Sequence, residues 1–285
     1  MSGLLLQQWS VLGFLIGSMA AVGLTLTPRA LLAPLGDGQL VGRALLLNFL
    51  LAPALAWLLT LLIPLARGHA IGLLLLGGAA GAPFLPRLVE NARGDLGLAA
   101  ALMVLLTAGT ILFLPLAMPL LIPDMKVDAW NIARPLLLLI VLPCLGGMLL
   151  KMCAAPIAAR VAPILALIGN ACLIVLFLLL VGLNFRSLLN VIGSGAILVA
   201  ILYIPGLLAV SWLVAGGKSE ARQVMALAAA ARNFGAALPP AASFADPNVT
   251  VMLIVSAIVC LVVTFLAAGW FRQRRDVVTQ DQGAE

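Results

Sequence analysis

The chain has 285 residues, of which 64% are hydrophobic and 9% are charged, and its formal net charge is +6. A soluble domain carries roughly a quarter of its residues as Asp, Glu, Lys or Arg. This chain therefore cannot cover a surface that faces water, and lipid must be its solvent. Its 16 Lys and Arg residues are scattered singly, which excludes a basic face for nucleic acid, so we expect no nucleic-acid partner.

The cysteines and the histidine form no metal-binding or catalytic pattern. The four cysteines lie in apolar stretches without CxxC spacing, which predicts small buried side chains rather than disulfides or metal ligands: Cys144, Cys153, Cys172 and Cys260. The single histidine, His69, lies near Arg67 between two apolar segments, and we expect it to be solvated in a loop. No acid–base or nucleophile–base pair stands at mid-span, so the sequence predicts no enzyme, no metal and no cofactor.

Hydropathy divides the chain into membrane spans. A bilayer core about 30 Å thick needs about 20 apolar residues in a helix, and nine segments reach that length, which predicts an all-α integral membrane protein: Leu4–Leu26, Gly42–Ile63, Ala70–Ala92, Leu96–Ile122, Ile132–Met152, Val161–Leu183, Val191–Ala215, Ala221–Ser243 and Val249–Phe271. The first is too long for a cleaved signal peptide and lacks its basic start. We expect residues 1–271 to form one transmembrane domain, and residues 272–285 a polar, disordered cytoplasmic tail.

Basic residues are distributed unequally between the two sets of loops. One set carries ten, namely Arg29, Arg43, Arg93, Lys151, Arg160, Lys218, Arg222, Arg272, Arg274 and Arg275; the other carries four, namely Arg67, Lys126, Arg134 and Arg186. Basic loops are retained in the cytoplasm. We therefore expect the N-terminus outside and the C-terminus inside, in the inner membrane of a bacterium.

Two of the nine segments are rich in small residues and interrupted by proline. The third reads GGAAGAPFLPRLVENARGD over Gly77–Asp95, and the eighth reads ALAAAARNFGAALPPAASFAD over Ala226–Asp246. A shift of 151 residues lays Asp95 on Asp246. The two segments are five spans apart, so they would cross the membrane in opposite directions. This is the pattern of an inverted repeat, and interrupted helices at matching positions point to a transporter's binding site.

The prolines indicate where the third segment is broken. Pro83 and Pro86 lack an N–H donor and disturb the helix ladder. Backbone groups freed at membrane depth are tolerated only inside the protein or beside a wet cavity. We expect breaks near Gly81–Pro86 and Arg232–Ala237 that cross at mid-membrane and contact the substrate. The alternative is that the prolines merely kink two packed helices.

Arg232 is the strongest candidate for a functional residue, because it lies eleven residues from either end of its predicted span. An arginine at that depth costs about 2.5–3.5 kcal/mol on insertion scales, and intramembrane charges usually mark function. We predict that Arg232 and its neighbour Asn233 contact the substrate. A structural arginine bonded to the carbonyls of a broken helix is the alternative. Asn48 in the second span is a weaker candidate, since a membrane asparagine often makes only a helix–helix hydrogen bond.

Three charged residues at the end of the third segment are candidates for ion coupling or gating. Arg87 and Glu90 have the i, i+3 spacing of an ion pair, and Asp95 follows them. They could line an inner vestibule. The alternative is an ordinary solvated helix end.

Four stretches, taken in their order, resemble the bile acid:sodium symporter family: VGLTLTPRALL (Val22–Leu32), NFLLAPALAWLL (Asn48–Leu59), ENARGDLGLAAALM (Glu90–Met103) and AARNFGAAL (Ala230–Leu238). The resemblance covers nearly the whole chain. It implies two inverted repeats, a panel and a core domain, two unwound helices that cross in the core, and transport of organic anions by alternating access. Many members have ten helices, and this chain resembles a member without the first.

The resemblance also implies where sodium ligands would lie, and here the chain departs from the pattern. The corresponding positions carry apolar, amide or cationic side chains: Leu85 and Pro86, Ala99, Met103, Ala228, Arg232 and Asn233, and Asn48. Apolar side chains supply no oxygen, and an arginine repels a sodium ion. We therefore expect a relative of the family that does not use sodium, in which Arg232 supplies a fixed positive charge.

The sequence thus predicts a secondary active transporter of a small organic anion. Coupling to protons or sodium within the same family is one alternative, and a membrane receptor that binds an organic anion without moving it is another. The sequence does not specify the substrate or the oligomeric state.

Overall fold

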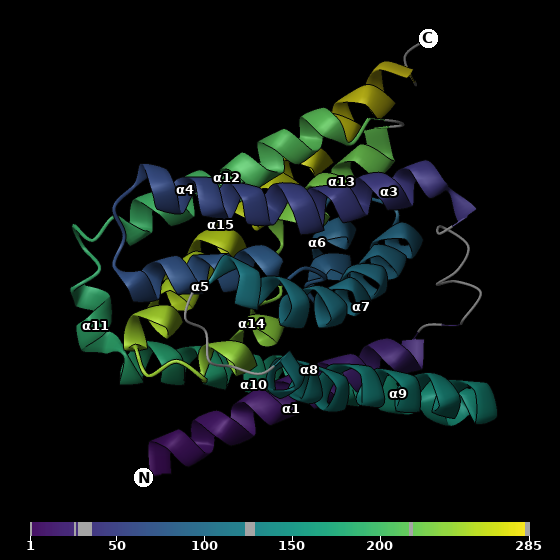
Figure 1. The fold of residues 1–285 in the computed structure, drawn as a ribbon. Coiled ribbons are helices and arrows are strands. Elements are labelled where there is room, and N and C mark those ends of the chain that lie inside the picture. The colour runs from purple at the N-terminus through teal and green to yellow at the C-terminus, as the bar shows by residue number, and fades with distance from the viewer. Residues whose placement is uncertain (1, 26, 28–35, 123–128, 217–218, 283–285) are drawn as a thin grey trace.

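The computed structural model describes residues 2–25, 27, 36–122, 129–216 and 219–282, and every regular element within these ranges is a helix (Figure 1). Arg29, Lys126 and Lys218 of the loop-charge comparison lie outside the described residues, as does the end of the first predicted span at Leu26.

Within the described residues, seven helical stretches are long and apolar enough to cross a membrane, so the chain is a multi-pass integral membrane protein. Each overlaps one of the predicted spans. They are α1 (Ser2–Thr25), the run α3 (Gly38–Leu46), η2 (Leu47–Leu51) and α4 (Ala52–Leu62), α7 (Leu96–Leu121), the run α8 (Ala129–Leu136), η3 (Leu137–Val141) and α9 (Leu142–Cys153), α10 (Ala155–Leu183), α12 (Ala196–Val214) and α15 (Pro247–Gln282). The short helix α11 (Phe185–Leu189) joins α10 to α12.

The third and eighth predicted spans are broken, as their small residues and prolines indicate. The third consists of α5 (Arg67–Gly78) and α6 (Leu85–Asn91), and the eighth of α13 (Ser219–Ala230) and α14 (Phe234–Ala241). Pro86 lies in the first turn of α6, where a missing N–H costs nothing. The alternative of merely kinked helices is therefore wrong.

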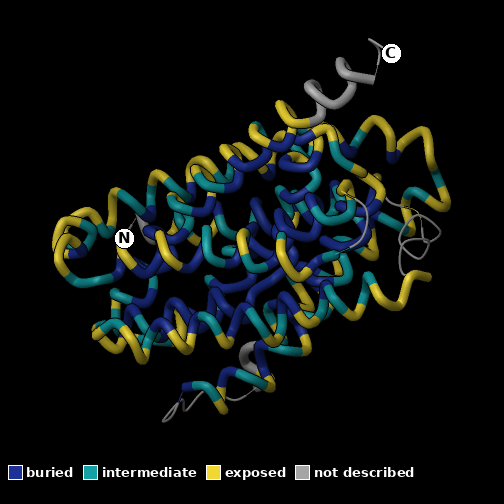
Figure 2. Tube along the Cα trace, turned by 90° about the horizontal axis from the view of Figure 1, so that it is seen from above, coloured by how far each residue is buried: buried dark blue, intermediate teal, exposed yellow. Residues whose placement is uncertain are grey.

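The helices form two layers. In Figure 1, α1, α8, α9 and α10 lie together below the remaining helices. Half of the apolar window of α7 and of α15 is buried, against 17% for α10. Figure 2 shows the same distribution, with buried backbone in the interior and exposed backbone on the outer helices. The upper layer therefore holds the core, and the lower layer turns much of its surface to lipid.

Glycines bring the helices of the lower layer close together. A Cβ on Gly13 of α1 would lie 2.6 Å from Cys172 Sγ of α10, and one on Gly17 would lie 3.2 Å from the Leu165 carbonyl oxygen. Small residues permit this close approach where lipid offers no hydrophobic driving force. The backbones of α1 and α10 therefore pack directly against each other.

Each of the two π-helical segments is followed by a proline. Pro53 follows η2 and Pro143 follows η3, each in the first turn of the next helix. A proline cannot donate to the carbonyl four residues before it, and a π-helical turn accommodates the loss. The segment η2 carries Asn48, so this local distortion also positions a candidate site residue.

Two expectations about the ends of helices are wrong. His69 is not in a solvated loop; it lies in α5 with 4% of its surface exposed, because Gly68 allows α5 to pack directly against Asp246 and Asn248 at the start of α15. The polar tail is not disordered up to Gln282, because α15 continues through it. No Gly or Pro interrupts residues 270–282, and extending an existing helix costs little.

Replacement of Gly81 by Ala should strongly destabilise the fold. Gly81 lies in the break between α5 and α6 with φ +77°, and a Cβ there would collide with Thr107 N and Oγ1 and lie 2.7 Å from the Met103 carbonyl oxygen. Strain and overpacking together should cost at least about 2 kcal/mol, measured by thermal unfolding in detergent. Gly182→Ala is the control, since a Cβ at Gly182 meets nothing within 4 Å. Equal melting temperatures for the two variants would contradict this account of the break.

Candidate functional site

The two helix breaks meet inside the upper layer and bond to each other. The Asn233 backbone N–H donates to the Ala79 carbonyl at 3.0 Å, and Asn233 Nδ2 donates to the Gly81 carbonyl at 3.0 Å. Asn233 also caps α14, because its Oδ1 accepts the Ala236 N–H at 3.0 Å. One side chain therefore links the breaks and starts the second half-helix. We call this meeting of residues 79–84 with residues 231–233 the crossing.

Arg232 lies at the crossing and is fully buried. Its Nε donates to the Leu76 carbonyl at 3.1 Å, and its Nη2 donates to the Gly77 carbonyl at 2.6 Å. Its Nη1 donates to Asn48 Oδ1 at 3.1 Å and to the Ala229 carbonyl at 3.3 Å. The four partners are three backbone carbonyls and one side-chain amide.

These carbonyls explain how a buried guanidinium is tolerated. The last four carbonyls of a helix have no intrahelical partner, and the C-terminal end of a helix carries a partial negative charge. Leu76 and Gly77 lie in the last turn of α5, and Ala229 lies in the last turn of α13. Arg232 thus satisfies the orphan carbonyls of Gly77 and Ala229 and shares the Leu76 carbonyl with the Ala79 N–H, so its charge lies at the negative ends of two half-helices.

Asn48 and Arg232 are in direct contact, as the prediction that both belong to one site requires. Asn48 is 1% exposed in η2; its Nδ2 donates to the Ala44 carbonyl at 3.0 Å, which fixes the amide with Oδ1 toward the arginine. Asn48 therefore accepts a hydrogen bond from the buried guanidinium of Arg232, and this bond joins the second predicted span to the eighth.

Two threonines of α7 complete the crossing, and we did not predict them from the sequence. Thr110 Oγ1 accepts the Ala80 N–H at 2.8 Å and donates to the Ala80 carbonyl at 3.0 Å. Thr107 Oγ1 lies 2.9 Å from the Gly81 carbonyl and 2.7 Å from the Met103 carbonyl. Backbone groups that the break removes from helical bonding thus find side-chain partners. The sequence did contain a signal for them, because these two threonines are the only polar side chains in the apolar helix α7.

The candidate prolines lie at the rim of the crossing. Pro83 is in the turn before α6, Pro86 is in its first turn, and both are half-buried. The positions matched to sodium ligands in the third span, Leu85 and Pro86, thus belong to α6, whereas the residues that bond across the crossing are Ala79 and Gly81.

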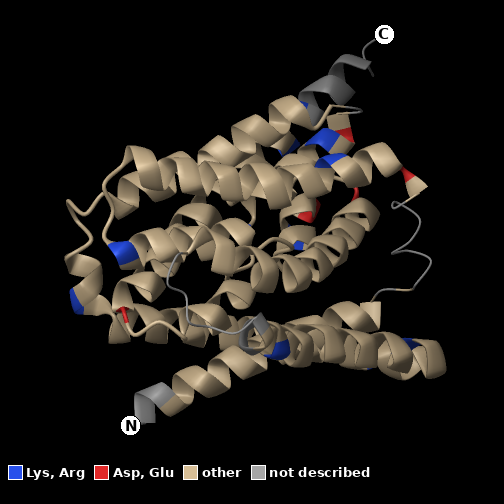
Figure 3. Ribbon diagram, in the orientation of Figure 1, with Lys and Arg blue, Asp and Glu red and all other residues tan. Residues whose placement is uncertain are grey.

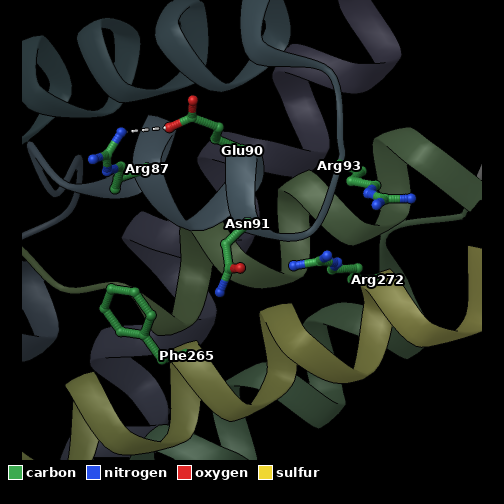
Figure 4. Close-up of a pocket in the computed structure, with 6 residues that line it drawn as sticks. All are labelled: Arg87, Glu90, Asn91, Arg93, Phe265 and Arg272. Atoms are coloured by element: carbon green, nitrogen blue, oxygen red, sulfur yellow. Dashed lines mark hydrogen bonds and ion pairs between the residues drawn. The ribbon is translucent and has the colours of Figure 1, made fainter.

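The candidate coupling residues lie away from the crossing. Arg87 and Glu90 form an ion pair at 2.8 Å, with side chains 77% and 54% exposed. They border a cavity of about 450 Å³ that Asn91, Arg93 and Arg272 also line (Figure 4). Asp95 is exposed and caps α7, because its Oδ1 accepts the Leu98 N–H at 2.9 Å. The structure therefore groups Arg87 with Glu90 at a cavity lined mainly by polar side chains and places Asp95 at a helix cap.

Apolar contacts close the crossing toward the lower layer. A Cβ on Gly235, in the first turn of α14, would lie 2.6 Å from Leu15 Cδ2 and 3.0 Å from Phe14 of α1. Leu15 is 1% exposed and Phe14 is 6% exposed. The start of α14 thus lies against the other layer, with no space for a substrate at this contact.

Thr110→Val should destabilise the protein by about 1–3 kcal/mol. Valine keeps the volume but leaves the Ala80 N–H and carbonyl without their hydroxyl partner in a buried setting. Thermal unfolding in detergent measures the effect. Thr60→Val is the matched control, because the Thr60 hydroxyl is exposed and bonds only the Trp57 carbonyl; surface changes of this kind usually stay within about 0.5 kcal/mol. Equal stabilities would show that Thr110 does not support the break.

Comparison with known proteins places the chain in a family. No curated protein sequence matches it. The family model described as the sodium bile acid symporter family matches residues 12–191, more than half of the 285-residue chain. The matched region includes α5, α6 and α7, and so includes one half of the crossing. The chain therefore belongs to the sodium bile acid symporter family, whose members are transporters of the bile acid and organic anion type.

Proposed function

We propose that the protein is a secondary active transporter that moves a small organic anion by alternating access without coupling to sodium. The observation that carries the proposal is the buried guanidinium of Arg232 at the crossing of two broken helices. Family membership supports the transport class. The sodium-independent mechanism rests on the crossing itself.

The proposed architecture has nine membrane spans in two inverted repeats. Seven long helices and two broken pairs supply the nine. The helices α7 and α15 begin at Leu96 and Pro247, the same 151 residues apart as Asp95 and Asp246. Both aspartates accept a backbone N–H at the start of the following helix, at 2.9 Å in each case. The matching order of half-helix, break, half-helix, aspartate and long helix supports the repeat.

We propose that the N-terminus lies outside and the C-terminus in the cytoplasm of a bacterial inner membrane. The excess of basic residues in one set of loops supports this orientation. In Figure 3, charged residues mark mainly the ends of the helices, while the middle of the bundle is almost uniformly uncharged. Residues 1–271 would be the transmembrane domain and residues 272–285 the cytoplasmic tail.

Arg232 would take the place of a sodium ion. In transporters with broken helices, unwound carbonyls and half-helix C-terminal ends coordinate the coupling cation, and these are the groups that bind Arg232. Three side-chain oxygens near the crossing already accept hydrogen bonds, namely Asn48 Oδ1, Asn233 Oδ1 and Thr110 Oγ1. A second cation would meet the repulsion of the guanidinium in a poorly screened site.

The substrate would bind at the crossing, where Arg232, Asn233 and Asn48 lie, with Pro83 and Pro86 at its rim. The fixed positive charge favours an anion such as a carboxylate, and the start of α14 adds backbone dipoles of the same sign. Access requires the two layers to separate at the contact between α14 and Leu15 of α1. We propose that alternating movement of the layers at this contact exposes the site to each side in turn.

Coupling to protons is the rival within transport, and Glu90 or Asp95 would then bind the proton. The ion pair of Glu90 with Arg87 borders the cavity of about 450 Å³ and could instead act as a gate at the inner mouth (Figure 4). Uptake measured with and without an imposed pH gradient, on the parent and on Glu90→Gln, separates the two roles. A gate changes the rate at every gradient, whereas a coupling site changes only the response to the gradient.

Transport should not require sodium. Replacement of sodium by choline at constant ionic strength should leave uptake of an organic anion into proteoliposomes nearly unchanged, because Arg232 already occupies the carbonyls that would bind the ion. The substrate for this assay comes from a thermal-shift screen of carboxylates and sulfonates. A steep, saturable dependence on sodium would refute the proposal. Binding without uptake in both buffers would identify a receptor rather than a transporter.

Arg232→Ala should lower the melting temperature, and added substrate anion should not restore it. The variant leaves the Gly77 and Ala229 carbonyls and Asn48 Oδ1 unsatisfied, at about 1–3 kcal/mol for each buried group, whereas the Leu76 carbonyl keeps the Ala79 N–H. Arg232→Lys should recover part of the loss, since an ammonium keeps the charge but not the planar fork. Arg186→Ala, an exposed arginine on α11, is the control for loss of charge alone.

The same variant tests whether Arg232 replaces a cation. With the guanidinium removed, sodium but not choline should partly restore the melting temperature of Arg232→Ala, because the vacated carbonyls are alkali-ion ligands. An alanine variant as stable as the parent that has lost anion binding would instead assign Arg232 a direct contact with the substrate. A variant that folds, binds and transports like the parent would refute both roles.

A further inference from the structure

A groove on the outer surface between α12 and α15 lies apart from the crossing. Its volume is about 640 Å³, and apolar or aromatic side chains line it throughout. Leu213 and Leu266 border the groove and are 73% and 70% exposed, and Ala209 is exposed beside them. In a membrane protein such a surface faces lipid, so the groove has the shape and chemistry to hold an acyl chain.

Aromatic rings line one end of this groove, and two arginines lie against these rings. Trp212 stacks on Phe271 with ring centroids 5.0 Å apart, and Trp270 meets Trp212 edge to face at 6.3 Å. The Arg222 Cζ lies 5.1 Å from the centre of the Trp212 ring, and the Arg274 Cζ lies 4.1 Å from the centre of the Trp270 ring. Tryptophans at the end of an apolar span belong at the level of lipid headgroups. The arginines therefore lie where phosphate groups are found.

Arg222 needs a hydrogen-bond acceptor that the described part of the chain does not supply. Its Nε is buried and bonds to no acceptor among the described residues. Leaving a buried N–H without a partner is costly, and most such groups in native proteins do have a partner. The π face of Trp212 attracts the charge of the guanidinium but leaves this N–H without an oxygen.

We propose that the groove binds an anionic phospholipid, with an acyl chain along Ala209 and Leu266 and with phosphate oxygens accepting hydrogen bonds from Arg222 and Arg274. Phosphate oxygens are strong acceptors for guanidinium groups. The guanidinium groups of Arg222 and Arg274 place two positive charges at this end of the groove, which favours a net negative lipid. This inference does not depend on what the protein transports.

Native mass spectrometry in neutral detergent tests the proposal, with phosphatidylglycerol and phosphatidylcholine of identical acyl chains as the probes. The parent should bind phosphatidylglycerol about 25-fold more tightly, which is about fivefold for each of the two basic residues near the headgroup. Arg222→Gln and Arg274→Gln should each remove about fivefold of that preference. Ala209→Phe fills the groove without a change of charge and should weaken both lipids. Arg186→Gln, on the exposed surface of α11, is the control and should change neither.

Each of four results would overturn the proposal. The first is equal affinity of the parent for the two lipids. The second is unchanged affinity in both Arg274→Gln and Ala209→Phe, two exposed positions at which a substitution does not disturb the core. The third is a dimer that Ala209→Phe abolishes, which would make a second copy of the chain the occupant. Glycerol phosphate and inorganic phosphate are tested by thermal unfolding. The fourth result is stabilisation by either that matches phosphatidylglycerol, which would assign the arginines to a free anion.

Discussion

A guanidinium held by the carbonyl ends of two half-helices is the interaction on which the crossing depends. Both breaks leave carbonyl groups without helical partners at membrane depth, where each unsatisfied group is costly. Arg232 bonds to Leu76 and Gly77 from one half-helix and to Ala229 from the other. Positive charge and orphan carbonyls therefore compensate each other, and neither would be tolerated alone.

Other residues of the upper layer supply hydrogen-bond partners for the backbone groups that Arg232 does not reach. Thr110 satisfies both backbone groups of Ala80, Thr107 reaches Gly81, and Asn233 joins the two breaks. These partners come from a neighbouring continuous helix or from the opposite break, so the break is stable only when the whole layer is assembled. This dependence accounts for the deep burial of α7, whereas the lower layer can remain exposed to lipid.

Much of this arrangement could be predicted from the sequence, and the limits have physical causes. Hydropathy located the long helices because a helix in contact with lipid must be apolar. The small residues and prolines located the breaks. The depth of Arg232 indicated its importance, but not its partners, because every residue carries a carbonyl and no side chain marks the one that is used. Burial of His69 and the role of Thr107 depend on which helix lies opposite, and that is a property of the assembled fold.

A fixed cation differs from a bound ion in one thermodynamic respect. A sodium ion that binds with the substrate and dissociates on the other side transfers the free energy of its gradient to transport. Arg232 supplies a similar electrostatic field, but it is covalently attached and returns with the protein in every cycle. In the proposed mechanism the crossing therefore binds its anion without drawing on a sodium gradient. Accumulation of substrate would then require another gradient, such as protons at Glu90 or a counter-transported anion, and without one the protein would only equilibrate its substrate across the membrane.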